Sequence, residues 1–125
     1  MKEIQGGVCA PAGFTAAGVH CGIRKNKTKK DLALLYSEVP CAAAAVYTKN
    51  LVKGAPITVT RENLADGRAQ AVLCNSGNAN TCNADGPAVA RRMCELAADA
   101  CGIDARDVIV ASTGVIGQRL DVSPI

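Results

Sequence analysis

The sequence predicts an α/β protein in which a sheet and helices form layers. The main observation is a strand–helix–strand succession, in which the apolar segments Gln70–Asn75 and Val108–Ala111 flank an amphipathic helix. Bulky side chains are also scarce, since the 125 residues include two Tyr, one Phe and no Trp. A core of Ala, Val, Leu and Cys lets elements approach closely, but each buried CH₂ contributes only about 0.8 kcal/mol. We therefore expect the chain alone to be marginally stable.

Four strands are expected before this unit. Alternating or apolar residues indicate the first two strands. Residues 1–13, which precede them and include three glycines, are expected to be irregular. The third segment is rich in alanine, but it follows Pro40 directly and ends in Val-Tyr-Thr, which favours a strand. The fourth carries Pro56 near its start, where a missing N–H is tolerated. The four expected strands are Phe14–Ile23, Leu32–Val39, Cys41–Thr48 and Ala55–Thr60.

The clearest predicted element is a helix from about Pro87 to Cys101. Apolar residues recur at helical spacing on one side, and charged residues occupy the other. Asp85 is the candidate N-cap, proline suits the first turn, and Gly102 is expected to end the helix. A single helical turn is expected over Arg61–Asp66, ended by the glycine that follows it.

The charge pattern argues against a nucleic-acid partner. The formal net charge is +3, and the basic residues between Arg24 and Lys30 are separated by Asn and Thr rather than by aromatic residues. A single-strand binder would place stacking aromatics there, so this cluster is expected to be a solvated loop that could still attract an anionic substrate. No apolar segment approaches the ~20 residues of a membrane span, and the polar N-terminus lacks a signal-peptide core. The sequence predicts a cytoplasmic protein that binds neither nucleic acid nor membrane.

The seven cysteines are odd in number and form no Cys-x-x-Cys pair. Metal ligation needs closer pairs, and only His20 could join them, so no metal site is predicted. His20 itself lies in an alternating segment and is expected to be structural. Most of the cysteines adjoin apolar residues, as free thiols do in a reducing compartment. One reactive thiol among them remains an alternative, although no base is evident beside any.

Polar segments follow both strands of the strand–helix–strand unit. The second strand is expected to stop at Ser112, Thr113 and Gly114 in a glycine-opened loop. A Thr-Gly pair at such a strand end can aim a hydroxyl and a backbone N–H at one oxygen, which would form an oxyanion hole; the alternative is a simple turn. The loop Asn75–Asn83 either braces its own backbone or contacts a ligand, since ligands gather at such strand ends.

Six segments, in the same order along the chain, resemble the ornithine acetyltransferase (glutamate N-acetyltransferase) family of arginine biosynthesis. The resemblance covers nearly the whole chain. Its most specific motifs are Asn-Ser-Gly-Asn-Ala-Asn at 75–80 and Ser-Thr-Gly-Val-Ile-Gly at 112–117. The six segments are Gly6–Phe14, Ala16–Ile23, Asp31–Leu35, Ala42–Thr48, Asn75–Asn80 and Ser112–Gly117.

The resemblance implies a layered fold of the self-cleaving N-terminal-nucleophile type. Residues 1–125 would be the N-terminal portion of a single larger domain, with no internal boundary. The family makes a precursor that cuts itself before a threonine, and this threonine takes the acetyl group of N-acetylornithine and passes it to glutamate. Thr113 and Gly114 match the pair that stabilises the oxyanion in the family. Some members of the family also accept acetyl-CoA.

The nucleophilic threonine of the family lies beyond the Ser-Thr-Gly motif, so this chain is expected to lack the nucleophile and to be inactive alone. The resemblance implies no cofactor. It implies a downstream β chain as partner, in a heterotetramer of two α and two β chains. Two alternatives are a related self-cleaving aminopeptidase or amidase, and a small cytosolic binding domain without catalysis. Apolar surface is expected to be exposed where the rest of the enzyme would pack.

Overall fold

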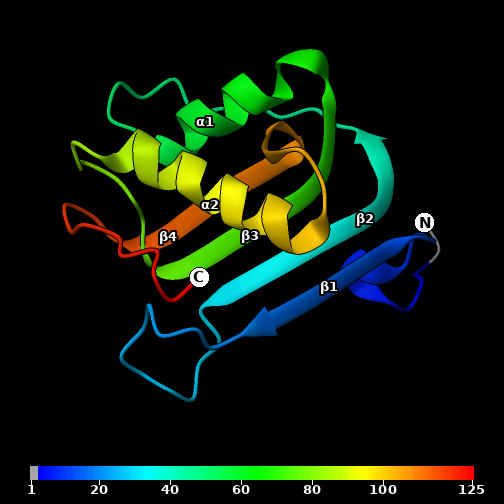
Figure 1. The fold of residues 1–125 in the computed structure, drawn as a ribbon, viewed down its shortest axis with the longest axis horizontal. Coiled ribbons are helices and arrows are strands. Elements are labelled where there is room, and N and C mark those ends of the chain that lie inside the picture. Colours follow the sequence, from blue (N-terminus) through cyan, green and yellow to red (C-terminus); the bar gives the residue numbers. More distant parts are fainter. Residues whose placement is uncertain (1–2) are drawn as a thin grey trace.

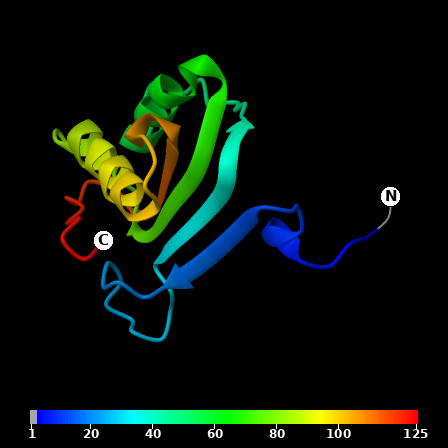
Figure 2. The same ribbon diagram turned by 45° about the vertical axis from the view of Figure 1, so that its right-hand side comes forward.

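The computed structural model describes residues 3–125 and contains a four-stranded sheet with two α-helices on one face (Figures 1 and 2). The strands are β1 (Phe14–Val19), β2 (Leu32–Ala42), β3 (Arg68–Asn78) and β4 (Val108–Val115), and the helices are α1 (Ala55–Asn63) and α2 (Gly86–Cys101). The strand order is β1-β2-β3-β4, with the first two pairings antiparallel and β3–β4 parallel. The predicted layered α/β class is confirmed. Short 3₁₀ turns occur at Gly7–Cys9, Leu64–Asp66 and Ala105–Asp107.

The predicted strand–helix–strand unit is confirmed as β3–α2–β4. Helix α2 ends at Gly102, which has a φ of 69° and donates its N–H to the Ala98 carbonyl. Asp85 occupies the N-cap position but does not cap the helix with its side chain. Its carboxylate is instead paired with Arg119 Nε at 2.6 Å, which ties the start of α2 to the C-terminal segment.

The core lies between the two helices and the parallel strands. Alternate residues of β3, including Ala71 and Leu73, are buried on the helix side of the sheet. Met93 of α2 and Val108 of β4 are fully buried against them. The small side chains predicted to build the core do so, since Ala, Val and Cys fill most of the remaining positions.

The segment Ala55–Thr60 is helical, so the prediction of a fourth strand was wrong. Pro56 lies in the first turn of α1, where its fixed φ and missing N–H suit a helix start. The buried residues Pro56, Val59 and Thr60 have the three- and four-residue spacing of a helix packed on one side. The β-branched residues suggest a strand locally, but packing of α1 on β4 overrides that preference. The expected helical turn over residues 61–66 is the end of α1 and the 3₁₀ turn after it.

The prediction of a separate strand over Cys41–Thr48 was also wrong. Strand β2 continues through Pro40, and residues 43–50 form neither helix nor strand. The pairing of β2 with β3 changes register between Tyr36 and Cys41. Pro40 therefore lies in an irregular stretch, where its missing N–H removes no hydrogen bond from a regular ladder.

Apolar side chains are exposed at several places, as expected for a chain with further packing partners. Within residues 3–125, no helix covers the sheet face opposite α1 and α2, and β1 extends away from the helices (Figure 2). Neither helix of this described part has the length and apolar character that crossing a membrane requires. The large apolar residues with the most exposure are Ile4, Val8, Val39, Val46, Leu51, Val52 and Ile116.

Candidate active site

The two motifs singled out in the sequence meet at the ends of the parallel strands. In the register of β3 with β4, Ser76 lies opposite Thr113 and Gly77 lies opposite Gly114. The small polar segment that follows the first strand of the unit therefore lies beside the Thr-Gly pair. This arrangement places both at the carboxyl ends of neighbouring parallel strands, where open α/β sheets bind ligands.

Both strands are longer than predicted. Strand β4 does not stop at Ser112 but continues to Val115, and β3 continues through the predicted loop to Asn78. The reason is the absence of side chains at Gly77 and Gly114, which have φ values of 111° and 132°. A Cβ on Gly114 would lie 2.6 Å from the backbone nitrogen of Asn78 and would overlap the carbonyl carbon of Gly77. Only glycine allows the two backbones to pair this closely.

Gly114 lies on the strand at the free edge of the sheet. Strand β4 is the outermost strand among residues 3–125. Val110 uses both of its backbone groups on the side away from β3, because its C=O and its N–H contact Thr60 Oγ1 at 3.0 and 3.3 Å. Backbone groups two residues apart along a strand point to the same side. The N–H of Ser112 therefore faces outward along this edge, and the exposed Gly114 follows two residues later, where the pairing with β3 becomes irregular.

Thr113 is exposed on the other face of β4 from the helices, because side chains alternate along a strand and Val108 and Val110 are buried. Ser112 has the opposite orientation, and its Oγ is buried without a hydrogen-bond partner in residues 3–125. It lines a hollow of about 340 Å³ beside Tyr47, Ile57 and Thr81. The Thr113 side chain and the Gly114 backbone are thus neighbours at the exposed end of the edge strand.

The asparagines after β3 brace the backbone, which is one of the two alternatives left by the sequence. Asn75 Nδ2 donates to the Asn78 carbonyl at 2.9 Å, and Asn78 Oδ1 accepts the Asn80 N–H at 2.8 Å. Asn78 Nδ2 reaches the Gln118 carbonyl at 2.8 Å, and Asn80 Nδ2 reaches the Gly86 carbonyl at 2.9 Å. These bonds join the ends of β3 and β4 to the start of α2.

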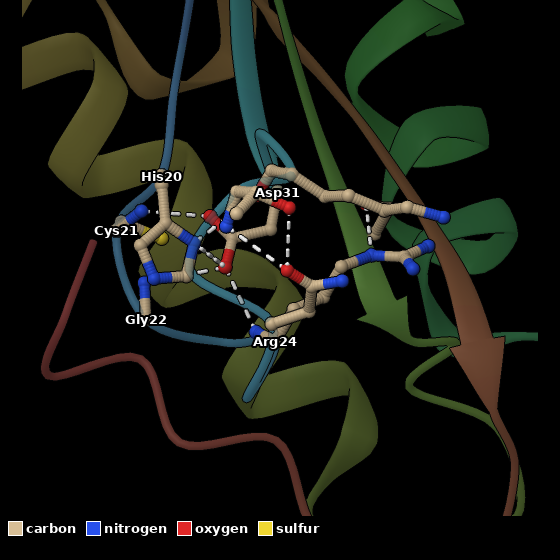
Figure 3. A network of polar contacts seen from close by, with 9 residues as sticks. His20, Cys21, Gly22, Arg24 and Asp31 are labelled. Carbon is tan, nitrogen blue, oxygen red and sulfur yellow. Dashed lines mark hydrogen bonds and ion pairs between the residues drawn. The ribbon is translucent and has the colours of Figure 1, made fainter.

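Asp31 is a buried carboxylate near the candidate site that the sequence analysis did not single out. Its side chain is buried at the start of β2, beside the turn that follows β1 (Figure 3). The carboxylate accepts the backbone N–H groups of Cys21, Gly22 and Arg24 at 2.7, 3.2 and 2.8 Å. Burial raises the pKa of Asp31, but the backbone hydrogen bonds outweigh burial, so the pKa lies well below its ordinary value. The carboxylate is therefore ionised and fixes the turn.

Arg24 connects this turn to β3. Its Nε donates to Ser76 Oγ at 2.9 Å, so the guanidinium lies over the strand that pairs with the Thr-Gly segment (Figure 3). The other basic residues of the cluster are exposed, as predicted for a solvated loop, whereas Arg24 is half-buried. A hollow of about 470 Å³ lies beside Gly77 and is lined by several cationic side chains, namely Arg24, Lys25, Lys29 and Arg119.

His20 has a structural contact, as the sequence suggested. Its Nδ1 lies 3.1 Å from Asp31 Oδ2 and 3.1 Å from the Lys29 carbonyl. Cys21 adjoins this pair, which superficially resembles a Cys–His–Asp arrangement. Burial raises the pKa of the Cys21 thiol, so the thiolate required of a nucleophile is disfavoured. Among residues 3–125, no group of three or more His, Cys, Asp or Glu side chains is arranged to hold a metal ion.

This architecture matches solved acetyltransferase structures closely. The structure of the arginine biosynthesis bifunctional protein ArgJ of Bacillus halodurans matches with a TM-score of 0.85 and 42% identity, over 90% of this chain and 59% of that one. Ornithine acetyltransferase of Mycobacterium tuberculosis, solved with ornithine, matches with a TM-score of 0.85 and 43% identity, over 92% of this chain and 63% of that one. The predicted layered fold is thus that of this class of transferase.

The sequence comparisons agree. Residues 15–125 match the profile of the ArgJ family, and the chain belongs to this family. The arginine biosynthesis bifunctional protein ArgJ of Symbiobacterium thermophilum is 53% identical over 127 aligned residues, which are 100% of this chain and 32% of the relative. The corresponding protein of Bacillus subtilis is 45% identical over 100% of this chain and 31% of its own length. The chain therefore spans about a third of the curated relatives that it matches.

Proposed function

We propose that residues 1–125 are the N-terminal portion of an acetyltransferase of arginine biosynthesis and supply its oxyanion-stabilising groups. The activity is transfer of acetyl from N-acetylornithine to glutamate. The observation that carries this proposal is the exposed Thr113–Gly114 pair at the end of the edge strand β4, where a hydroxyl and a glycine backbone adjoin opposite Ser76 and Gly77. Family membership and the ornithine complex of the similar Mycobacterium tuberculosis enzyme support the substrate class.

The proposed mechanism is acyl transfer through a threonine that lies outside this chain. The threonine hydroxyl attacks the acetyl carbonyl of N-acetylornithine, and the carbonyl oxygen becomes an oxyanion that accepts hydrogen bonds from Thr113 Oγ1 and the Gly114 N–H. Collapse of the intermediate releases ornithine, whose amine takes the proton, and leaves an acetyl-threonine. The amine of glutamate then attacks this ester, so N-acetylglutamate forms and the threonine is regenerated.

The proposed partner of this segment is the remainder of the longer polypeptide that the relatives represent, called the full-length enzyme below. Self-cleavage of that polypeptide would leave the nucleophile at the start of a β chain, paired with this α chain in a heterotetramer of two of each. The exposed apolar residues of the sheet and of residues 43–53 are consistent with such packing. No cofactor is required by this chemistry.

The test is the Thr113→Ala variant of the full-length enzyme. We expect kcat to fall by about 10²–10³, the effect of losing one oxyanion donor. KM should change far less, because the oxyanion exists only near the transition state. The exposed Thr58 of α1 provides a control, and Thr58→Ala should keep the wild-type kcat. A Thr113→Ala enzyme with kcat within about twofold of wild type would contradict the assignment of this residue.

A further inference from the structure

The turn after β1, residues 20–24, packs on the far side of β3 from the Thr-Gly segment. A Cβ on Gly77 would lie 2.9 Å from Arg24 Cγ and 3.2 Å from Ile23 Cγ2. On its other side Gly77 is in close backbone contact with Gly114. The turn therefore lies against Gly77, and Gly77 lies against Gly114. Neither glycine has a side chain that would separate these segments. A displacement of the turn changes the space available to Gly77, and through it to Gly114.

Asp31 holds the turn and β3 at the same time. Its carboxylate accepts three backbone N–H groups of the turn, and its own carbonyl accepts the Ser76 N–H at 2.8 Å. Arg24 adds a second link between the same two segments through its bond to Ser76 Oγ. Figure 3 shows the carboxylate at the centre of the turn, with the Arg24 side chain extending toward the strand. Ser76, and with it Gly77, is thus held by two hydrogen bonds: one from the Ser76 N–H to the Asp31 carbonyl and one from Arg24 Nε to the Ser76 hydroxyl.

We propose that Asp31 and Arg24 are positioning residues of the oxyanion site: they fix the turn over residues 20–24 against Gly77 and so set the position of the Gly114 N–H. This inference rests on the proposed function. Neither residue touches the reacting atoms. Their effect is geometric, because an oxyanion donor acts only within about 2.7–3.1 Å of the oxygen that carries the developing charge. Such residues are expected to affect kcat and to leave ground-state binding of substrate almost unchanged.

The experiment compares Arg24→Ala, Ser76→Ala and Asp31→Asn in the full-length enzyme, with acetyl transfer from N-acetylornithine to glutamate as the assay. Arg24→Ala removes both the stem that packs on Gly77 and the bond to Ser76. We expect it to lower kcat per folded protein about tenfold to a hundredfold, since small misplacements of catalytic groups have effects of this size. KM should stay within about twofold. Ser76→Ala should also lower kcat, but by less than Arg24→Ala does. Asp31→Asn should lower kcat at least as much as Arg24→Ala.

The matched control is Asp104→Asn. Asp104 also accepts a backbone N–H, that of Arg106 at 2.8 Å, but it lies just before β4, at the end of that strand opposite Gly114. This variant should keep the wild-type kcat. If Asp31→Asn fails to fold, Arg24→Ala and Ser76→Ala still decide the question, because each removes only a half-exposed contact.

The outcomes separate this inference from the proposed function. If Thr113→Ala lowers kcat while Arg24→Ala and Ser76→Ala have wild-type kcat, the positioning role is overturned and the proposed function stands. If Arg24→Ala raises KM at unchanged kcat, Arg24 binds substrate and the positioning role is likewise overturned. If Thr113→Ala itself has no effect, the oxyanion site is assigned wrongly and both fall together.

Discussion

Thr60 Oγ1 contacts both backbone groups of a single residue, Val110, at 3.0 Å to the carbonyl and 3.3 Å to the N–H. The two residues are 50 positions apart, and the contact is buried. One hydroxyl thereby replaces the missing neighbour strand at the middle of the β4 edge. Asn63 extends the same attachment, because its Nδ2 donates to the carbonyls of Ala105 and Val108 at 3.1 and 2.8 Å.

Replacing Thr60 with valine should therefore destabilise the protein, although the valine side chain has nearly the same shape as that of threonine. Thr60→Val leaves the Val110 N–H and C=O buried without a partner, which costs roughly 1–3 kcal/mol. Thr58→Val on the exposed side of the same helix should change the free energy of unfolding by less than about 0.5 kcal/mol. Urea unfolding of both variants provides the comparison. Equal stability of the two variants would show that water can hydrogen-bond the Val110 N–H and C=O in place of the Thr60 hydroxyl.

Alanine at Gly114 should be far more damaging than alanine at Gly117. Both glycines have positive φ values, 132° and 71°, but only Gly114 has atoms in the space of a Cβ. Gly114→Ala should cost roughly 2–6 kcal/mol, the sum of backbone strain and overpacking. Gly117→Ala should cost only about 1–2 kcal/mol of strain. Thermal unfolding of the two variants tests this difference, and comparable melting temperatures would refute the close approach of β3 and β4.

The buried carboxylate of Asp31 predicts a loss of stability in acid. Its pKa is lowered on folding, so the stabilisation is fully present above the unfolded value of about 3.9 and is lost as the pH falls from there toward the lower native value. The free energy of unfolding should therefore decrease below about pH 4. Asp31→Asn should be less stable at neutral pH and should show a shallower decrease in acid. An unchanged slope in this variant would assign the acid sensitivity to other carboxylates.

The thiols should differ strongly in reactivity. Burial raises the pKa of Cys94 to about 11, and its Sγ lies 3.6 Å from the Val108 carbonyl inside the core. At pH 8 only about one in a thousand such thiols is ionised. Cys9 and Cys82 are exposed, so iodoacetamide should label them first and Cys94 last. Mass spectrometry of native protein after brief alkylation measures this order, and early labelling at Cys94 would contradict its burial.

The elements with consistent local signals were predictable. Helix α2 combines apolar periodicity, an early proline and a terminal glycine, and all three agree with the structure. Helix α1 was missed because its β-branched residues favour a strand, while its attachment depends on Val110, which lies far along the chain. Propensity within a short segment cannot report such a distant partner.

The candidate site was only partly predictable for a related reason. The Thr-Gly pair and the asparagines are motifs, and their parallel placement follows from the strand–helix–strand unit. Asp31 begins one of the six segments of the family resemblance, but that segment does not reveal its role, which is defined by backbone N–H groups of a turn seven to ten residues earlier. A lone acidic residue at the start of an apolar strand, directly after a basic loop, was the available signal.

The sheet order also bears on how the chain folds. Strands β1 and β2 are neighbours both in sequence and in space, so their antiparallel pairing closes the short connection over residues 20–31 and forms early. The connection from β2 to β3, residues 43–67, is longer and includes α1. The parallel pairing of β3 with β4 must wait until α2 has crossed the sheet, and α1 can attach to β4 only after that strand is in register. We expect the edge carrying Gly114 to be the last part of residues 3–125 to acquire its native structure. Substitutions there should then accelerate unfolding while leaving the refolding rate nearly unchanged.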